Sequence, residues 1–472
     1  MGRIHLIGIG GSGMSAIARV LLERGQAVSG SDRHLTPLAK QLRAAGVQIF
    51  EGHQPGNITG AELVVRSSAV PDHNVEVQEA IAQGIPVLKR AHFLGDLMID
   101  KTGIAIAGTH GKTTTASMIA WVLTVLNQSP SFILGGVSKN LGTNARAGNG
   151  TIFVIEADEY DRMFLGLRPT IQVVTNVEHD HPDCFPTAAD FFRAFTEFVD
   201  RLEPTGVLLA CGDDTGALRL AQQTAAEGVR SMLYGLGRAE GVEVEYLARN
   251  LEPNRVGGFD FEIYHTGARL AEASLQVPGK HNVLNAMAAL AVADLLSLPM
   301  DRAAFAISEF QGAGRRFELR GEAGGVTVID DYAHHPTEIR ATLAAARARY
   351  PGRRICAVWQ PHTYSRTEMF FGDFIGSFTE ADQVVVTEIY AARELARQDL
   401  SALQLVDAMK SKKAVYLPTL EQAVIYLQSG LKPGDVLIVL SAGDADWIST
   451  QILKILAGPP AGDANGQVGG RD

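Results

Sequence analysis

Short apolar runs alternate with longer segments over the first hundred residues of the chain. The runs lie at residues 4–9, 27–29, 47–50, 63–66 and 85–88. The segments between them are long enough for helices. This alternation predicts β-α-β units, in which successive strands pair in parallel.

The pattern changes in the middle of the chain. Apolar runs at 104–107, 152–155 and 171–174 and a helix-length segment at 188–202 continue the α/β pattern. Between residues 242 and 277, apolar and polar residues instead alternate, as in Phe259-Asp-Phe-Glu-Ile-Tyr264. A period of two is typical of antiparallel strands with one solvated face. We therefore predict a small antiparallel sheet attached to a parallel one.

A third series of apolar runs lies at 326–329, 355–358, 384–387, 414–417 and 436–440. It predicts another α/β sheet. A length of 472 residues is enough for about three domains. We place these domains at residues 1–101, 102–313 and 314–457. The remaining residues, 458–472, lack apolar content and are expected to be disordered.

Composition narrows the range of partners. A net charge of −10 argues against general attraction to nucleic acid or to an anionic membrane. No apolar run is long enough to span a bilayer. The three cysteines, Cys184, Cys211 and Cys356, are odd in number and far apart, which favours a reducing compartment and hence a cytoplasmic protein.

The first glycine turn, Gly8-Ile-Gly-Gly-Ser-Gly13, lies between a predicted strand and a predicted helix. Such a G-x-G-x-x-G turn lets backbone N–H groups approach a diphosphate, and Asp32 follows the second strand at a distance suited to a ribose hydroxyl. The alternative is a tight turn that binds no ligand. The motif does not indicate which nucleotide is bound.

A phosphate-binding loop, Gly108-Thr-His-Gly-Lys-Thr-Thr114, follows the strand at 104–107 and precedes a helix predicted over 114–126. Gly108 and Gly111 allow the N–H groups to turn inward, Lys112 reaches the phosphates, and the Thr113 hydroxyl can bind Mg²⁺. The loop is two residues shorter than the usual G-x-x-x-x-G-K-T, which argues against the motor and switch NTPases.

Acidic residues follow the next two strands, in Glu156-Ala-Asp-Glu159 and Asn176-Val-Glu-His-Asp-His181. Ligands of open α/β sheets bind at the carboxyl ends of strands, so Glu156 can complete a Mg²⁺ site with Thr113, and His181 can serve a second cation. Solvated acidic loops are the alternative. His179-Asp-His-Pro-Asp183 also has the H-x-H-x-D spacing of dinuclear zinc hydrolases. Such a zinc site is disfavoured, because those enzymes have a histidine after the aspartate, where this chain has Cys184.

Three further polar segments could contribute to a site, and the second of them lies where the chain leaves the central domain. Gly279-Lys-His-Asn-Val-Leu-Asn285 opens an alanine-rich helix and suits either adenine or phosphate binding or simple capping. The pair Arg315-Arg316 is either a phosphate-binding bridge or a solvated pair. Two adjacent histidines beside two aspartates, in Asp330-Asp-Tyr-Ala-His-His335, are more typical of a functional site than of structure.

Taken in order, these segments resemble the Mur ligases of bacterial cell-wall synthesis, and among them the alanine-adding branch. The resemblance runs from about residue 4 to 450. It is carried by Ile7 to Met14, Gly108 to Thr115, Glu156 to Glu159, Thr175 to His181, Gly279 to Asn285, Gly314 to Phe317, Asp330 to Glu338, and Gln360-Pro-His362.

The resemblance implies an α/β protein of three domains. These are a Rossmann-like N-terminal domain for the uridine nucleotide, a central domain like the P-loop ATPases with an added antiparallel sheet, and a Rossmann-like C-terminal domain for the amino acid. It implies that ATP, with two Mg²⁺ ions, activates the lactyl carboxylate of UDP-N-acetylmuramate as an acyl phosphate, which the amine of L-alanine attacks. A monomer or homodimer is expected.

The resemblance also implies roles for individual residues. Lys112, Glu156, His181 and Arg316 would be catalytic, with Thr113, Glu156 and His181 as metal ligands. ATP would contact Gly108, Thr109, His110, Gly111, Lys112, Thr113, Thr114, His281, Asn282, Asn285, Arg316 and Asp331. The nucleotide sugar would contact Gly10, Gly11, Ser12, Gly13, Met14, Asp32, Ser67 and Ser68. The amino acid would contact Tyr332, His334 and Arg366, with Arg366 pairing to its carboxylate.

Two features bear on the choice of branch. Residues 182–202 contain no lysine, whereas sister ligases often carry a carbamylated lysine there, so the alanine-adding branch is favoured. Thr363 stands where that branch often has an arginine, which leaves amino-acid selectivity open. The alternatives are a murein-peptide recycling ligase, an NAD-dependent oxidoreductase and a non-catalytic nucleotide sensor. The oxidoreductase leaves the phosphate loop unexplained, and the sensor leaves the phosphate-transfer residues unused.

Overall fold

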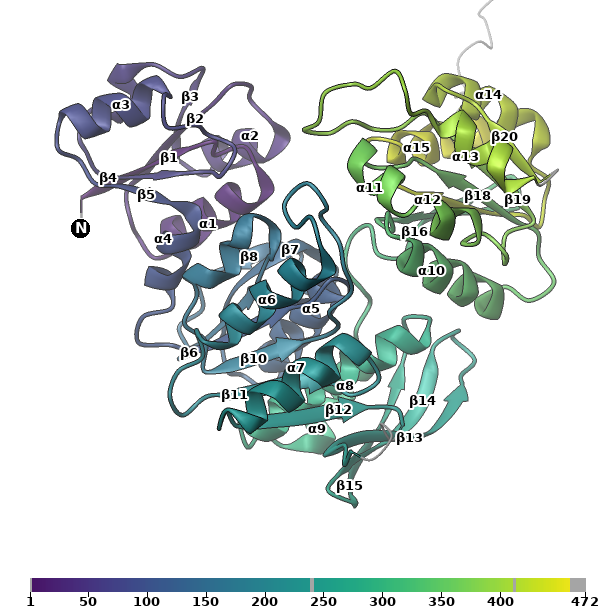
Figure 1. The fold of residues 1–472 in the computed structure, drawn as a ribbon, viewed down its shortest axis with the longest axis horizontal. Coiled ribbons are helices and arrows are strands. Elements are labelled where there is room, and N and C mark those ends of the chain that lie inside the picture. Colours follow the sequence, from purple (N-terminus) through teal and green to yellow (C-terminus); the bar gives the residue numbers. More distant parts are fainter. Residues whose placement is uncertain (1, 238–241, 411–412, 459–472) are drawn as a thin grey trace, which may run out of the picture. The chain divides into compact units, whose positions relative to one another are not determined.

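The computed structural model describes residues 2–237, 242–410 and 413–458 (Figure 1). It comprises two compact units, Met1–Gly314 and Arg315–Asp472. The predicted disordered tail lies, except for Gly458, outside the described residues. No helix of the described residues is long and apolar enough to cross a membrane.

The first unit begins with a five-stranded parallel sheet of order β3-β2-β1-β4-β5. Its strands are β1 (Arg3–Ile7), β2 (Val28–Asp32), β3 (Gln48–Glu51), β4 (Ala61–Arg66) and β5 (Val87–Lys89), and its helices are α1 (Ser12–Glu23), α2 (Pro37–Ala44), α3 (Val75–Ala82) and α4 (Arg90–Leu97). A short 3₁₀ helix, η1 (Pro55–Ile58), precedes β4. The apolar residues of the central strand β1 are buried, as are Val28 of β2 and Val64 and Val65 of β4, which is typical of the inside of a parallel sheet.

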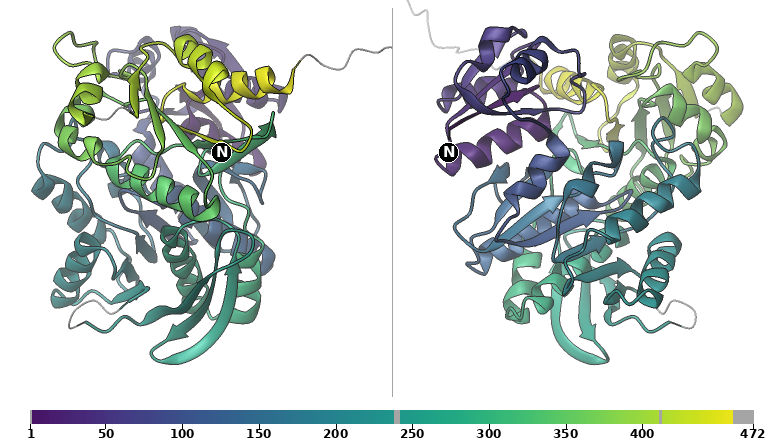
Figure 2. Two further views of the ribbon diagram at one scale, coloured as in Figure 1. Left: turned by 90° about the vertical axis from the view of Figure 1, so that its right-hand side faces the viewer. Right: turned by 60° about the vertical axis from the view of Figure 1, so that its left-hand side comes forward.

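The same unit continues into a ten-stranded sheet of order β15-β14-β13-β12-β11-β10-β6-β9-β7-β8. Its first strands in the chain are β6 (Thr102–Ala107), β7 (Ser131–Ser138), β8 (Thr143–Arg146), β9 (Ile152–Glu156) and β10 (Ile171–Val174). They are followed by β11 (Val207–Cys211), β12 (Ser231–Gly235), β13 (Tyr246–Pro253), β14 (Phe259–His265) and β15 (Ala268–Leu275). The last three strands pair antiparallel and curl away as an extension at one end of the sheet (Figure 2).

Helices cover this sheet: α5 (Lys112–Val125), α6 (Ala188–Val199), α7 (Thr215–Ala226), α8 (Lys280–Leu295) and α9 (Met300–Ser308), with η2 (Tyr160–Gly166) after β9. Most residues of α5 and α8 are buried, which is typical of helices inside a core. These two helices pack against each other. Their packing brings the start of α8 beside the loop that precedes α5.

The second unit contains a six-stranded sheet of order β16-β17-β21-β18-β19-β20. The strands are β16 (Glu318–Ala323), β17 (Val326–Asp331), β18 (Ile355–Trp359), β19 (Gln383–Val386), β20 (Ala414–Tyr416) and β21 (Val436–Leu440), and only β16 pairs antiparallel. The helices are α10 (Pro336–Arg349), α11 (Tyr364–Met369), α12 (Phe371–Ile375), α13 (Ala402–Met409), α14 (Leu420–Gly430) and α15 (Asp446–Ala457).

The predicted fold class is confirmed: parallel sheets with helices, and a small antiparallel sheet joined to the central one. The period-two segment forms β13–β15, as its alternation indicates. The predicted helix at 188–202 ends earlier, at Val199, and the helix predicted from residue 114 begins at Lys112. The sequence analysis did not identify β7, β8, β11, β12 or β16.

Candidate active site

The phosphate loop connects β6 to α5, and its shape depends on two glycines. Gly108 has φ +134° and Gly111 has φ +79°, values that side chains disfavour. A Cβ at position 108 would lie 2.0 Å from Thr175 Oγ1, and a Cβ at position 111 would lie 2.7 Å from Asn285 Oδ1. Glycine is therefore required here both by the backbone conformation and by the closeness of neighbouring residues.

The residues after β10 support this loop. The N–H of His110 donates to Asn176 Oδ1 at 2.7 Å, and Thr109 Oγ1 donates to the carbonyl oxygen of Glu178 at 2.6 Å. His110 Nε2 also lies 3.0 Å from Glu178 Oε2. Part of the acidic stretch at 176–181 therefore supports the loop structurally, and this role could not be inferred from its charge.

Lys112 stands at the first position of α5, and its ammonium group lies against the loop. Its Nζ donates to the carbonyl oxygen of Thr109 at 3.1 Å and to Glu159 Oε1 at 3.0 Å. Burial alone would lower the pKa of Lys112, but the carboxylates of Glu159, Asp158 and Glu156 outweigh it and raise the pKa. The lysine therefore stays positively charged at neutral pH, as a phosphate-binding group must.

Thr113 and Glu156, the predicted Mg²⁺ ligands, are brought together. Thr113 Oγ1 lies 3.1 Å from Glu156 Oε1, and the second carboxylate oxygen accepts a hydrogen bond from the N–H of Gly135 at 2.7 Å. A hydroxyl and a carboxylate oxygen beside a phosphate loop are the ligands that Mg²⁺ prefers. The residues present therefore fit this ion.

His181 lies on the other side of Glu159. Its Nε2 is 3.4 Å from Glu159 Oε1, and its backbone has φ +55°, which is strained for a residue other than glycine. The backbone N–H groups of Cys184 and Phe185 both donate to the His181 carbonyl oxygen, at 2.9 and 2.8 Å. The turn after His181 thus fixes the backbone at this residue, and its imidazole lies against Glu159.

Glu159 joins these groups, and the sequence analysis did not assign it a role. Its side chain is only 1% exposed, and its carboxylate pairs with Lys112 at 2.9 Å as well as with His181. Burial alone would raise the pKa of Glu159, but the charges of Lys112 and His181 outweigh it and lower the pKa. The one available signal was its position three residues after Glu156, which could not show that the side chain turns inward.

The glycine turn of the first sheet is held by Asp32 and Thr36. Asp32 Oδ2 accepts from the N–H of Gly10 at 2.8 Å, and Thr36 Oγ1 donates to the Gly10 carbonyl oxygen at 2.9 Å. Asp32 therefore stabilises the turn, and its predicted contact with ribose stays a prediction. Met14 is 1% exposed and belongs to the core, so a contact with nucleotide would have to come from its backbone.

The serines at the end of β4 lie close to the same turn. The N–H of Ser67 donates to the Ile7 carbonyl oxygen at 3.1 Å, and a Cβ at Gly8 would lie 3.1 Å from Ser67 Cβ. Ser68 is exposed. The structure thus places Ser67 against the predicted nucleotide-sugar turn.

At the start of α8, two predicted ATP-binding residues are buried and bonded to each other. Asn285 Nδ2 donates to Asn282 Oδ1 at 3.0 Å, while Asn285 Oδ1 accepts from Thr115 Oγ1 at 3.1 Å. Asn285 therefore links α8 to α5 beside the phosphate loop. His281 is exposed at the beginning of the same helix.

In the second unit, the Asp331 side chain connects the segment before β16 to the segment after β17. Its carboxylate oxygens accept from the N–H groups of Phe317 and Ala333, each at 2.7 Å. Burial raises the pKa of Asp331 to about 6, although Arg316 opposes this. The Arg316 guanidinium lies 5.0 Å from the centre of the Tyr332 ring and 3.6 Å from Glu338 Oε1.

The predicted amino-acid-binding residues lie in a connected group. The rings of Tyr332 and His334 are 5.4 Å apart, and the rings of His334 and His362 are 5.8 Å apart. Arg366, which is 2% exposed, places Nη1 3.1 Å from His362 Nδ1. The structure therefore brings Tyr332, His334 and Arg366 together and adds His362, which the sequence analysis did not assign.

Comparison with known proteins agrees with this arrangement. Three family models match in order: the Mur ligase family catalytic domain over residues 3–102, the Mur ligase middle domain over 106–293, and the Mur ligase glutamate ligase domain over 315–443. The chain belongs to the Mur ligase family. The resemblance inferred from the sequence motifs is confirmed.

Individual Mur ligases are similar over nearly the whole chain. The UDP-N-acetylmuramate–L-alanine ligase of Nitratidesulfovibrio vulgaris is 43% identical over 453 residues, covering 95% of this chain and 98% of that protein. The solved UDP-N-acetylmuramate-alanine ligase of Thermotoga maritima has a TM-score of 0.79 at 29% identity, covering 96% and 98%. A murein peptide ligase from Psychrobacter arcticus has a TM-score of 0.69 at 26% identity, covering 98% and 100%.

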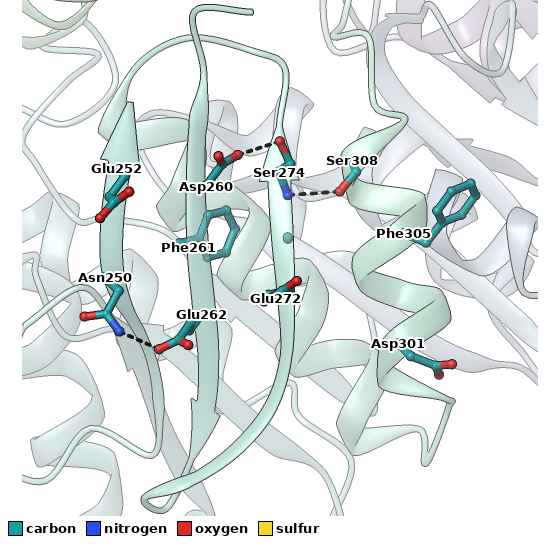
Figure 3. Close-up of a pocket in the computed structure, with 11 residues that line it drawn as sticks. Asn250, Glu252, Asp260, Phe261, Glu262, Glu272, Ser274, Asp301, Phe305 and Ser308 are labelled. Atoms are coloured by element: carbon teal, nitrogen blue, oxygen red, sulfur yellow. Dashed lines mark hydrogen bonds between the residues drawn. The ribbon is translucent and has the colours of Figure 1, made fainter. Parts of the chain in front are cut away.

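A cavity of about 620 Å³ in this Mur ligase lies between β13–β15 and α9 (Figure 3). Its lining is acidic, but Arg269 pairs with both Glu262 and Glu272, at 3.1 and 2.7 Å. Asp260 accepts a hydrogen bond from Ser274 Oγ at 2.5 Å. Asp260, Glu262 and Glu272 thus have hydrogen-bond or ion-pair partners within this extension, and we assign the cavity no part in the reaction.

Proposed function

We propose that this Mur ligase joins L-alanine to the lactyl carboxylate of UDP-N-acetylmuramate and converts ATP to ADP and phosphate. The observation that carries the proposal is the cluster of side chains at the phosphate loop. Lys112 and His181 both contact Glu159, and Thr113 at the start of α5 contacts Glu156. The similarity to L-alanine ligases over nearly the full chain supports the choice of substrates.

The reaction has two steps. A lactyl carboxylate oxygen attacks the γ-phosphorus of ATP, which forms an acyl phosphate and releases ADP. The alanine amine then attacks the acyl carbon, and the tetrahedral intermediate collapses with expulsion of phosphate. Lys112 and the N–H groups of the loop 108–111 stabilise the negative charge that develops on the phosphoryl oxygens, so positioning and electrostatics supply most of the catalysis.

Two metal positions belong to the proposal. Thr113 and Glu156 would hold one Mg²⁺, and His181 would hold a second. Mg²⁺ neutralises phosphate charge when it is bound. Glu159 keeps the Lys112 ammonium and the His181 imidazole in position beside this site.

The remaining groups are assigned to substrates. We assign Gly10, Gly11, Ser12, Gly13, Met14, Asp32, Ser67 and Ser68 to the nucleotide sugar, and the loop 108–114 with His281, Asn282, Asn285, Arg316 and Asp331 to ATP. Tyr332, His334 and Arg366 are assigned to the amino acid. The corresponding domains are residues 1–101, 102–313 and 314–457, and catalysis requires them to close around the three substrates.

A murein peptide ligase is the competing function, because such a protein also resembles this fold over its whole length. It would use the same nucleotide sugar and a preformed tripeptide. The buried Arg366 suits the small carboxylate of a free amino acid, and the relatives at 41–43% identity are L-alanine ligases. We therefore favour alanine. A cytoplasmic location, as a monomer or homodimer, accompanies this proposal.

An isotope experiment tests the mechanism. UDP-N-acetylmuramate labelled with ¹⁸O in its lactyl carboxylate is incubated with the protein, ATP, Mg²⁺ and L-alanine, and the released phosphate is analysed by mass spectrometry. An acyl phosphate transfers one carboxylate oxygen to phosphate, so the released phosphate is expected to carry one ¹⁸O atom. Turnover with unlabelled phosphate would refute the acyl-phosphate step.

A further inference from the structure

A second cavity in the first unit connects the glycine turn with the acidic end of β9. Its volume is about 100 Å³, and its lining includes Ser12 and Gly13 of the glycine turn and Glu156 and Asp158 of the acidic segment. Arg90, the first residue of α4, also lines it and is its one cationic residue. The cavity thus leads from the turn where a nucleotide sugar is proposed to bind to the carboxylate beside the phosphate loop.

The Arg90 guanidinium has poor acceptors within the protein. Its Nε donates to Met163 Sδ at 3.0 Å, Nη2 contacts the same sulfur, and Asp158 Oδ2 is 3.9 Å from Nη2. A thioether is a weak acceptor, and a guanidinium carries five N–H donors. The side chain is only 19% exposed, and burial lowers the pKa of Arg90 although Asp158 and Asp161 oppose this. A buried cation with such partners favours an anionic ligand.

The guanidinium also lies directly against the glycine turn. A Cβ at Gly13 would be 1.9 Å from Arg90 Nη1, so the arginine occupies space that is open only because residue 13 has no side chain. Helix α1 begins at Ser12, its N-cap Gly11 makes no side-chain cap, and its first turn contains no acidic residue. The N–H groups at this helix start and the Arg90 guanidinium therefore face the same part of the cavity.

We propose that Arg90 binds the diphosphate of the nucleotide sugar, together with the N-terminus of α1. This inference rests on the proposed function for the identity of the substrate. Arg90 is the cation among the lining residues, so an anionic group settles where its guanidinium lies against Gly13, whereas the Glu156 carboxylate repels it. The planar guanidinium matches two phosphate oxygens at once, which a lysine cannot do.

The test is calorimetric titration of the full chain with UDP, uridine, UDP-N-acetylmuramate and UDP-N-acetylglucosamine, the last of which has the diphosphate but no carboxylate. Arg90→Gln is expected to weaken UDP and UDP-N-acetylglucosamine by the same factor, about tenfold or more, and to leave uridine unchanged. Arg90→Lys should recover part of the affinity. Lys40→Gln, which removes an exposed cation from α2 in the same domain, is the matched control and should change the UDP affinity less than about twofold. Circular dichroism checks that each variant is folded.

Three outcomes would overturn the assignment. In the first, Arg90→Gln binds UDP as tightly as Lys40→Gln does. In the second, the variant binds UDP normally but loses affinity for UDP-N-acetylmuramate, which would place Arg90 at the lactyl carboxylate. In the third, the wild-type chain binds no UDP and catalyses no ligation, which would refute the proposed function as well. If the wild-type chain still catalyses ligation, the first outcome refutes the role of Arg90 alone and leaves the proposed function intact.

Discussion

Replacing Glu159 with glutamine tests whether this carboxylate positions the phosphate-transfer groups. Glutamine has nearly the same shape but no charge, so the ion pairs with Lys112 at 2.9 Å and with His181 at 3.4 Å are lost. The Lys112 ammonium is 13% exposed and would remain in a largely buried site without this partner. Removing one partner of a buried ion pair lowers the free energy of unfolding by about 3–5 kcal/mol. The glutamine amide can still form hydrogen bonds, so we expect a loss of about 3 kcal/mol.

The effect on catalysis follows from geometry. A misplacement of about 1 Å in a reacting group can cost about 100-fold in rate. We therefore expect Glu159→Gln to lower kcat about 100-fold, while the KM for UDP-N-acetylmuramate, which binds at the glycine turn, changes less than about twofold. The assays are steady-state phosphate release and equilibrium unfolding in urea at pH 7.

The pH dependence gives an independent readout. The folded-state pKa of Glu159 is lowered from its ordinary value of 4.5, so its contribution to stability is present above that value and is lost as pH falls through the folded pKa. The difference in unfolding free energy between wild type and Glu159→Gln should shrink as the pH falls below about 4.5. A merely steric role would give no such change.

The matched control is Glu197→Gln on α6, which removes a carboxylate from a partly exposed ion pair with Arg162. Such pairs contribute at most about 1 kcal/mol, so stability and kcat should stay close to those of the wild type. Equal kcat and equal stability in the two variants would refute the positioning role of Glu159.

Three further predictions concern the same sites. Lys112→Met should lower kcat at least about 1000-fold in phosphate release and destabilise the protein by about 3 kcal/mol in urea unfolding, because it leaves the Glu159 charge buried and unpaired. Adding Glu159→Gln removes that charge, so it should restore stability but not kcat. Arg366→Lys should raise the KM for L-alanine about tenfold or more without changing that for ATP, because lysine cannot form the paired hydrogen bonds of a guanidinium. Gly111→Ala should cost about 1–2 kcal/mol and weaken ADP binding in calorimetry, since it strains a backbone at φ +79° and crowds Asn285.

The strands and loops that surround the phosphate site were predictable from local sequence. Residues 104–107 are apolar, and Gly108 and Gly111 appear just before a helix, so strand, loop and helix could be recognised in order. Glu156 follows a four-residue apolar run, and carboxyl ends of parallel strands share one edge of a sheet. Periodicity and chain order therefore located these residues without any knowledge of the tertiary structure.

Other parts depend on pairings that local sequence does not contain. Strand β7 pairs antiparallel with the next strand, β8, and in parallel with the strand after it, β9. Closeness in sequence does not distinguish these two kinds of pairing. Strand β16 has exposed and polar residues, so its apolar pattern is weak, and it is defined by its pairing with β17. The sequence could not reveal either arrangement.

Side-chain direction is the second limit. Asp158 and Glu159 are adjacent acids of one loop, but only Glu159 lies between Lys112 and His181, because the backbone after β9 turns that way. Arg90 lies against Gly13, which belongs to a different βα unit. Both residues acquire a role only through contacts distant in sequence.

The most direct test of the central claim is the choice of amine. The wild-type protein is supplied with UDP-N-acetylmuramate, ATP and Mg²⁺, and with L-alanine and a murein tripeptide at equal concentration, and the nucleotide-sugar product is identified by mass spectrometry. The expected main product is UDP-N-acetylmuramoyl-L-alanine, formed together with ADP and phosphate. A main product carrying the tripeptide, or no amide product with either amine, would contradict it.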